Sequence, residues 1–151
     1  MTSITIGQLL NAIESTLATA PTLARAMKYS ELTEGVSDTP MLEVYPESGD
    51  QDVASGSTDR TTFRAGVRQS QVVVNCDYYA QQRAHLGEDM AKLVDGIDAL
   101  YTIFEAQDKK PYFGLVGLQA FHWQWQRVIF NRGDPAINYV GARFTVTVRV
   151  F

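Results

Sequence analysis

Two parts of the chain carry apolar residues at the spacing of one helix face. Near the N-terminus these residues are Ile6, Leu9, Leu10, Ile13 and Leu17. They predict an amphipathic helix over residues 4–19, which Pro21 ends. The second and longer stripe consists of Leu86, Met90, Leu93, Val94, Ile97, Leu100, Tyr101 and Phe104. Its length and continuity predict the helix that anchors the core.

Four further segments have the character of strands. Met41–Tyr45 is short and has a proline at each end, which is typical of a sheet edge because proline cannot donate a backbone hydrogen bond. Longer strands are predicted over Phe63–Tyr79, Phe121–Arg127 and Val140–Val150, where apolar and polar residues alternate. Combined with the two helices, these strands predict a single α+β domain, residues 1–151, in which two helices cover one face of an antiparallel four-stranded sheet.

The segment after the first strand has a composition of its own. Residues 47–59 contain two glycines, three serines and four acidic residues, and neither lysine nor arginine. This composition predicts a flexible acidic loop at about residues 47–62.

Charge is distributed unevenly along the 151 residues. Residues 1–60 hold three basic and nine acidic side chains, whereas residues 61–151 hold ten basic and eight acidic ones. Such asymmetry favours association with another copy or a complementary neighbour, although a solvated surface explains it equally well. The overall charge of −4 argues against a dedicated nucleic-acid-binding protein. Apolar runs of only a few residues predict no membrane span.

Few residues are candidates for catalysis or metal binding. Cys76 alternates with valines and is predicted to be a buried small residue rather than a nucleophile. His85 and His122 are predicted to lie at the surface, without a second titratable group to support acid–base catalysis. The acids of the long helix fit a solvated face better than a metal site; they are Glu88, Asp89, Asp95 and Asp98. We therefore predict no catalytic residue, no cofactor and no metal, and hence no enzyme.

The two tryptophans allow two interpretations. Trp123 and Trp125 share one strand face with Phe121 and Ile129, which predicts core packing, with Trp123 under Met90, Leu93 and Ile97 of the long helix. Alternatively, flat aromatic rings bind sugars or bases. A small ligand- or sugar-binding domain would then use Trp123, Trp125, His122 and Gln124.

The order of elements and several local segments resemble a known family. The helix ending near Pro21, the proline-led strand Pro40–Tyr45, the long strand running into a Leu-rich helix, and above all the closing strands Phe121–Arg127 and Tyr139–Phe151 resemble the tail terminator proteins of long-tailed bacteriophages. These proteins are also called tail completion or minor tail proteins. The resemblance covers nearly the whole chain in architecture and pattern; residues 22–38 match nothing in it.

The resemblance implies a structural protein of the virion and no catalysis. It implies a ring of identical subunits, usually a hexamer, that ends the tail tube and gives the head and neck a surface on which to dock. The implied partners are other copies, the tail tube protein and the head–tail connector or neck protein, with DNA only passing through the lumen. The implied location is the tail or neck of the virion, after assembly in the host cytoplasm. A neighbouring neck or head-closure protein of the same particle is the alternative within this class.

Charged residues around the acidic loop are the candidate subunit or partner contacts. They are Glu47, Asp50, Asp52, Asp59, Arg60, Arg64, Arg68, Lys109 and Lys110. In a ring, the loop would either line the lumen or dock on a basic surface of the next subunit, to which the three arginines would contribute. A tolerated surface insertion is the third interpretation.

Overall fold

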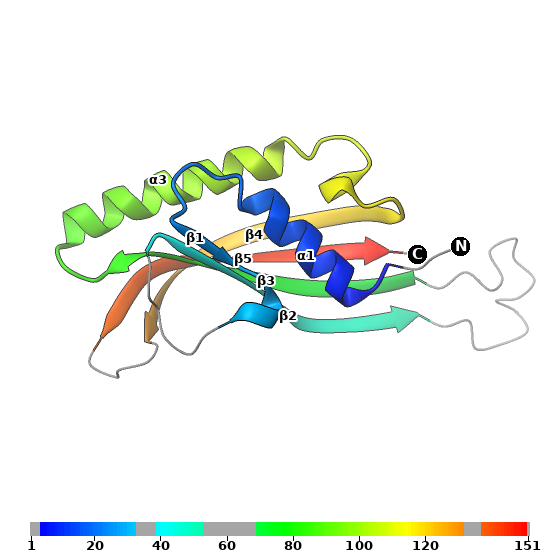
Figure 1. Ribbon diagram of the computed structural model, residues 1–151, viewed down its shortest axis with the longest axis horizontal. Helices are drawn as coiled ribbons and strands as arrows, with labels where there is room; N and C mark the ends of the chain where they lie inside the picture. The colour runs from blue at the N-terminus through cyan, green and yellow to red at the C-terminus, as the bar shows by residue number, and fades with distance from the viewer. Residues whose placement is uncertain (1–3, 33–38, 53–68, 132–136, 151) are drawn as a thin grey trace, which may run out of the picture.

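The computed structural model describes residues 4–32, 39–52, 69–131 and 137–150 (Figure 1). The elements in chain order are the helix α1 (Ile6–Leu17), the strand β1 (Arg25–Met27), the 3₁₀ turn η1 (Tyr29–Glu31), the strands β2 (Met41–Asp52) and β3 (Gln69–Gln82), the helix α3 (Leu86–Glu105), the 3₁₀ turn η2 (Tyr112–Gly114), and the strands β4 (Leu118–Asn131) and β5 (Asn138–Val150).

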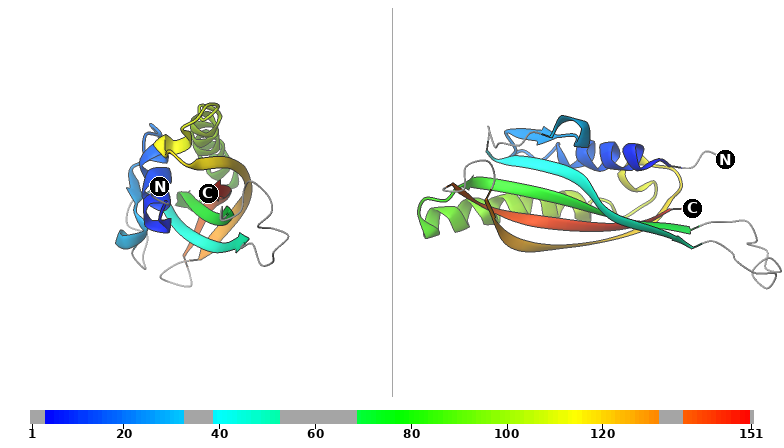
Figure 2. Two further views of the ribbon diagram at one scale, coloured as in Figure 1. Left: turned by 90° about the vertical axis from the view of Figure 1, so that its right-hand side faces the viewer. Right: turned by 90° about the horizontal axis from the view of Figure 1, so that it is seen from below.

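The strands form one sheet in the order β1-β2-β3-β5-β4. Neighbouring strands are antiparallel except β1 and β2, which run parallel. Both helices lie on the same face of this curved sheet (Figures 1 and 2). The α+β class is therefore confirmed, but the sheet has five strands and is mixed. The additional strand β1 is only three residues long, too short for a pattern of alternation to reveal it.

The predicted end of the first strand is wrong. β2 does not stop at Tyr45 but continues through Pro46 to Asp52, paired with β3. Its register shifts between Pro46 and Ser48, and such a bulge is a position where a strand tolerates proline. Glu47, Asp50 and Asp52 therefore belong to the sheet and not to the predicted loop at about 47–62, and the rest of that loop lies outside the described residues.

The helix α1 begins with a capping box. The Thr5 side chain accepts a hydrogen bond from the Gln8 backbone N–H at 3.1 Å, while the Thr5 N–H donates to the Gln8 side chain at 3.0 Å. The apolar face of the helix is buried as predicted at Leu9, Leu10, Ile13 and Leu17, whereas Ile6 in the first turn is 54% exposed.

The helix α3 closes the same core over β3 and β5. It buries Leu93, Ile97, Leu100 and Phe104 against a sheet face that includes Val74, Cys76, Phe144 and Val146. Gly96 permits the close approach, because a side chain at this position would collide with the ring of Tyr78. No helix in the described part of the chain has the length and apolar character that crossing a bilayer requires.

A smaller apolar cluster lies on the opposite face of the sheet. It consists of Met27, Met41, Tyr79, Phe130 and Tyr139. The rings of Tyr79 and Phe130 stack with their centroids 4.4 Å apart. At this end the sheet therefore has buried apolar side chains on both faces, which agrees with an unbroken apolar run at Tyr78, Tyr79 and Ala80.

Candidate assembly surfaces

Large apolar side chains stand exposed on β4 and on the adjoining side of α3. We call this surface the β4 strip and define it by Leu86, Val94, Tyr101, Trp125 and Ile129, which are between 42% and 69% exposed. Two contacts tie the helix to the strand: Tyr101 meets Trp123 edge to face at 4.9 Å, and Arg127 Nη1 lies 3.8 Å from Met90 Sδ. β4 is also the last strand of the sheet, so its outer edge pairs with no other strand of the described residues.

The two tryptophans have different environments although they share a strand face. Trp123 is partly buried. Its ring stacks on the ring of Phe104 with the centroids 4.7 Å apart, and its centroid lies 6.3 Å from that of Phe144. Trp125, by contrast, is 45% exposed. The predicted packing of both tryptophans in the core is thus wrong for Trp125. The ring contacts of Trp123 on α3 are with Tyr101 and Phe104, further along the helix than the predicted partners Met90, Leu93 and Ile97. This is because β4 starts beside the C-terminal end of α3 and runs back toward its beginning, where Arg127 contacts Met90.

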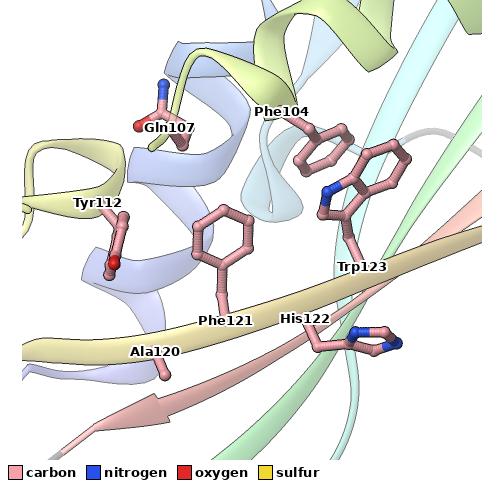
Figure 3. Close-up of a pocket in the computed structure, with 7 residues that line it drawn as sticks. All are labelled: Phe104, Gln107, Tyr112, Ala120, Phe121, His122 and Trp123. Carbon is pink, nitrogen blue, oxygen red and sulfur yellow. The ribbon is translucent and has the colours of Figure 1, made fainter. Parts of the chain in front are cut away.

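A pocket of about 400 Å³ opens beside the first half of β4 (Figure 3). Its lining consists of Phe104, Gln107, Tyr112, Ala120, Phe121, His122 and Trp123. Phe121 and Trp123 point toward the helix, whereas His122 points to the other side of the strand (Figure 3). Gln124 lies on the same strand face as His122. The four residues of the alternative sugar site are therefore divided between two faces of the sheet.

On the face away from the helices, a polar network joins three strands. Arg143 Nε donates to Asp77 Oδ1 at 2.8 Å, and the Tyr45 hydroxyl donates to Asp77 Oδ2 at 2.7 Å. Next to them, Asn75 Nδ2 donates to Glu47 Oε2 at 2.9 Å. Burial, together with the neighbouring Asp77 carboxylate, raises the pKa of Tyr45. The network holds Glu47 against the sheet, so this predicted contact residue has a structural partner within its own chain.

The charges of the sheet differ between its two sides. β2 contains Glu43, Glu47, Asp50 and Asp52 and no basic residue. β4 and β5 together contain Arg127, Arg143 and Arg149 and no acidic residue. The asymmetry along the sequence therefore becomes an asymmetry across the sheet, with an acidic side at β2 and a basic side at β4.

The remaining predicted contact residues fall into two groups. Lys109 and Lys110 are exposed in the loop from α3 to η2, and Gln107 and Tyr112 of the same connection line the pocket. That loop is fastened by the Phe113 N–H, which donates to Gln107 Oε1 at 2.9 Å. Four predicted contact residues lie outside the described residues: Asp59, Arg60, Arg64 and Arg68. The docking of the acidic loop on the arginines of the next subunit therefore stays a prediction.

The residues considered for catalysis or metal binding lie in different environments. Cys76 is fully buried, and burial raises the pKa of its thiol, as predicted for a core residue. His85 is exposed just before α3. Asp89 departs from the predicted solvated face: it is buried and accepts hydrogen bonds from Gln81 and from the Ala84 N–H. Within the described ranges, no three His, Cys, Asp or Glu side chains gather as a metal site would require.

No protein-family model matches the chain, and no curated protein matches it.

Proposed function

We propose that this protein is a ring-forming structural subunit of the tail terminator type, which ends a phage tail tube and presents a docking surface to the head and neck. The observation that carries the proposal is the β4 strip, which runs along the open edge of a 14-residue strand. An exposed apolar patch and an open strand edge both favour contact with another chain, and here Trp125 brings the two together on one strand.

Two further features support assembly. Aromatic residues are enriched at the centres of protein interfaces, and the β4 strip contains Tyr101 and Trp125. The acidic strand β2 lies toward one edge of the sheet, and the basic strands β5 and β4 lie at the other edge. This separation favours contacts between unlike surfaces of identical chains. The resemblance in element order gives this assembly its biological setting, namely the ring at the end of a phage tail.

The test combines a mass measurement with a matched pair of variants. Light scattering after gel filtration, with and without tail tube protein, is expected to give a defined multimer that negative-stain images display as a ring. Ile129→Ser is expected to weaken assembly, because Ile129 belongs to the β4 strip and is 50% exposed. Val116→Ser is the control, because Val116 is 86% exposed but lies in the turn before β4.

The possible results have distinct meanings. A wild-type protein that stays monomeric at high concentration and with tube protein would refute the proposal. A ring that binds neck protein but not tube protein would instead assign the chain to the neighbouring neck ring. Equal assembly of both variants would remove the β4 strip from the interface.

A further inference from the structure

The outer edge of β2 is only partly covered. β1 pairs with β2 over three positions, Met41 to Glu43. From Val44 to Asp52, β2 pairs with β3 on one side and with no strand of the described chain on the other. The sheet therefore has a second open edge, opposite the edge at β4.

These two open edges lie at the same level along the strands. The sheet register places Val44, Cys76, Phe144 and Trp125 in one row across β2, β3, β5 and β4. A second row contains Gln51, Ser70, Val150 and Leu118. The uncovered part of β2 thus corresponds in height to the first half of β4, Leu118 to Trp125.

The strand directions also fit. Each of the three steps from β2 to β3, β5 and β4 is antiparallel, so β2 and β4 run in opposite directions. A second copy related by rotation about an axis along the strands would bring the uncovered part of its β2 beside the first half of β4 of the first copy. Beyond Trp125 the two strands would have to diverge, because β1 of the second copy occupies the edge of Met41 to Glu43. The two strands would then be antiparallel, and the sheet would continue from one copy into the next.

Charge selects this arrangement over a symmetrical one. The open part of β2 exposes Glu47 and Asp50. The facing segment Leu118–Trp125 contains no Lys, Arg, Asp or Glu, but Arg149 of the neighbouring β5 is exposed in the same row of the sheet as Asp50. Two β4 edges facing each other would bring the basic sides together and leave both acidic edges without a partner. Pairing of unlike edges instead matches acid with base, and repetition of such a head-to-tail contact generates a ring when the rotation from copy to copy closes.

We infer that the occupant of the β4 edge is β2 of a second copy, whose segment Val44–Asp52 adds as an antiparallel strand to Leu118–Trp125. This inference rests on the proposed ring and specifies its subunit contact. Of the β4 strip, Trp125 lies within the joined segment.

The experiment uses two charge-reversed variants of the full chain. The first, Ser48→Lys with Asp50→Lys, makes the β2 edge basic, and the second, His122→Glu with Gln124→Glu, makes the β4 edge acidic. All four residues are exposed, and lysine or glutamate at an exposed strand position leaves the core intact. Asp95→Lys serves as the control, because Asp95 is an exposed acid on α3 that lies about 100° around the helix from Val94 of the β4 strip.

Each variant alone is expected to lose assembly, with an association constant at least roughly tenfold weaker than that of the wild type, because like charges then face each other at every contact. An equimolar mixture is expected to restore it, because a basic β2 edge then meets an acidic β4 edge. Native mass spectrometry of the mixture should find the two variants in equal numbers, and Asp95→Lys should assemble like the wild type.

Other results overturn the inference in recognisable ways. If the β2 variant assembles normally alone while the β4 variant does not, the contact joins two β4 edges and the head-to-tail arrangement is wrong, although a multimer remains. If both variants assemble alone like the wild type, neither edge is in the contact. If the mixture of the two variants assembles again but forms no ring and binds no tube protein, the edge contact is supported and the proposed function is refuted. A monomeric wild type would refute both.

Discussion

Arg143 and Asp77 are register partners on adjacent strands and form a two-point ion pair on the face of the sheet that the helices leave open. Arg143 Nε lies 2.8 Å from Asp77 Oδ1, and Arg143 Nη2 lies 3.2 Å from Oδ2. The Tyr45 hydroxyl completes a triangle, because it donates to Asp77 and accepts from Arg143 Nη2 at 3.1 Å. The triangle fastens β2, β3 and β5 together. Only 3% of Asp77 is exposed, so its carboxylate depends on these donors.

Replacing Arg143 by methionine is therefore expected to destabilise the fold strongly. The change keeps an apolar stem but leaves a buried carboxylate without its cation, a loss of about 3–5 kcal/mol in the free energy of unfolding. Arg149→Met is the matched control on the same strand, since Arg149 is exposed, and it should change stability by less than about 0.5 kcal/mol. Urea unfolding at pH 7 measures both values, and equal values would contradict the structural role of the pair.

The Tyr45 hydroxyl gives the same network a dependence on alkaline pH. Folding raises the pKa of Tyr45. The stabilisation that the Tyr45 hydroxyl gives to the folded state is therefore complete below about pH 10, the ordinary tyrosine pKa, and is lost as the pH rises toward the pKa in the folded state. Tyr45→Phe should be less stable than the wild type by about 1.5–3 kcal/mol at pH 7, since a hydrogen bond to a charged group is removed. The difference should narrow above pH 10. Tyr29→Phe, at an exposed tyrosine, is the control in the same series of urea titrations, and a constant difference across pH would contradict the argument.

The helices and the core could be predicted because their patterns are long and regular. β5 alternates without a break. The stripe of α3 identifies the helix and its buried residues Leu93, Ile97, Leu100 and Phe104, but it also includes Leu86, Val94 and Tyr101, which are exposed. β1 and the second half of β2 could not be predicted in this way. Pro46 and a run of polar residues resemble the end of a strand, and only the pairing with β3 keeps the segment Glu47–Asp52 extended.

The candidate surface was predictable in its residue types but not in its position. Alternation placed Trp123 and Trp125 on one face correctly, yet it contains no information on how far α3 reaches along β4. The offset between helix and strand leaves Trp125 exposed while Trp123 is stacked on Phe104. Similarly, the acidic and basic halves of the sequence were visible, but their separation to opposite sides of the sheet follows from the strand order.

Cys76 should report the opening of the core. It is the only cysteine of the chain, is fully buried, and has a thiol pKa raised chiefly by burial. Since the thiolate is the reactive form, a chromogenic disulfide reagent at pH 8 should react with the native protein at least roughly a thousandfold more slowly than with the protein in urea. The rate should increase in Arg143→Met about tenfold for each about 1.4 kcal/mol of lost stability, and it should remain unchanged in Arg149→Met. Immediate reaction of the native wild type would place the thiol at the surface.

The two tryptophans separate folding from assembly, because they share a strand face but differ in what covers them. Trp123 contacts Tyr101, Phe104 and Phe144, so Trp123→Ala should cost an amount near the lower end of the about 3–5 kcal/mol typical of buried aromatic residues, given that its ring is partly exposed. Trp125 belongs to the β4 strip, and Trp125→Ala should change the stability of the monomer by less than about 1 kcal/mol while weakening the ring. Urea unfolding of the dilute monomer measures the first quantity, and light scattering over a concentration series measures the second. If Trp125→Ala assembled like the wild type, the most exposed aromatic ring of β4 would have no part in the contact. If Trp125→Ala instead lost as much stability as Trp123→Ala, its side chain would belong to the core, and the β4 strip would no longer be an exposed surface.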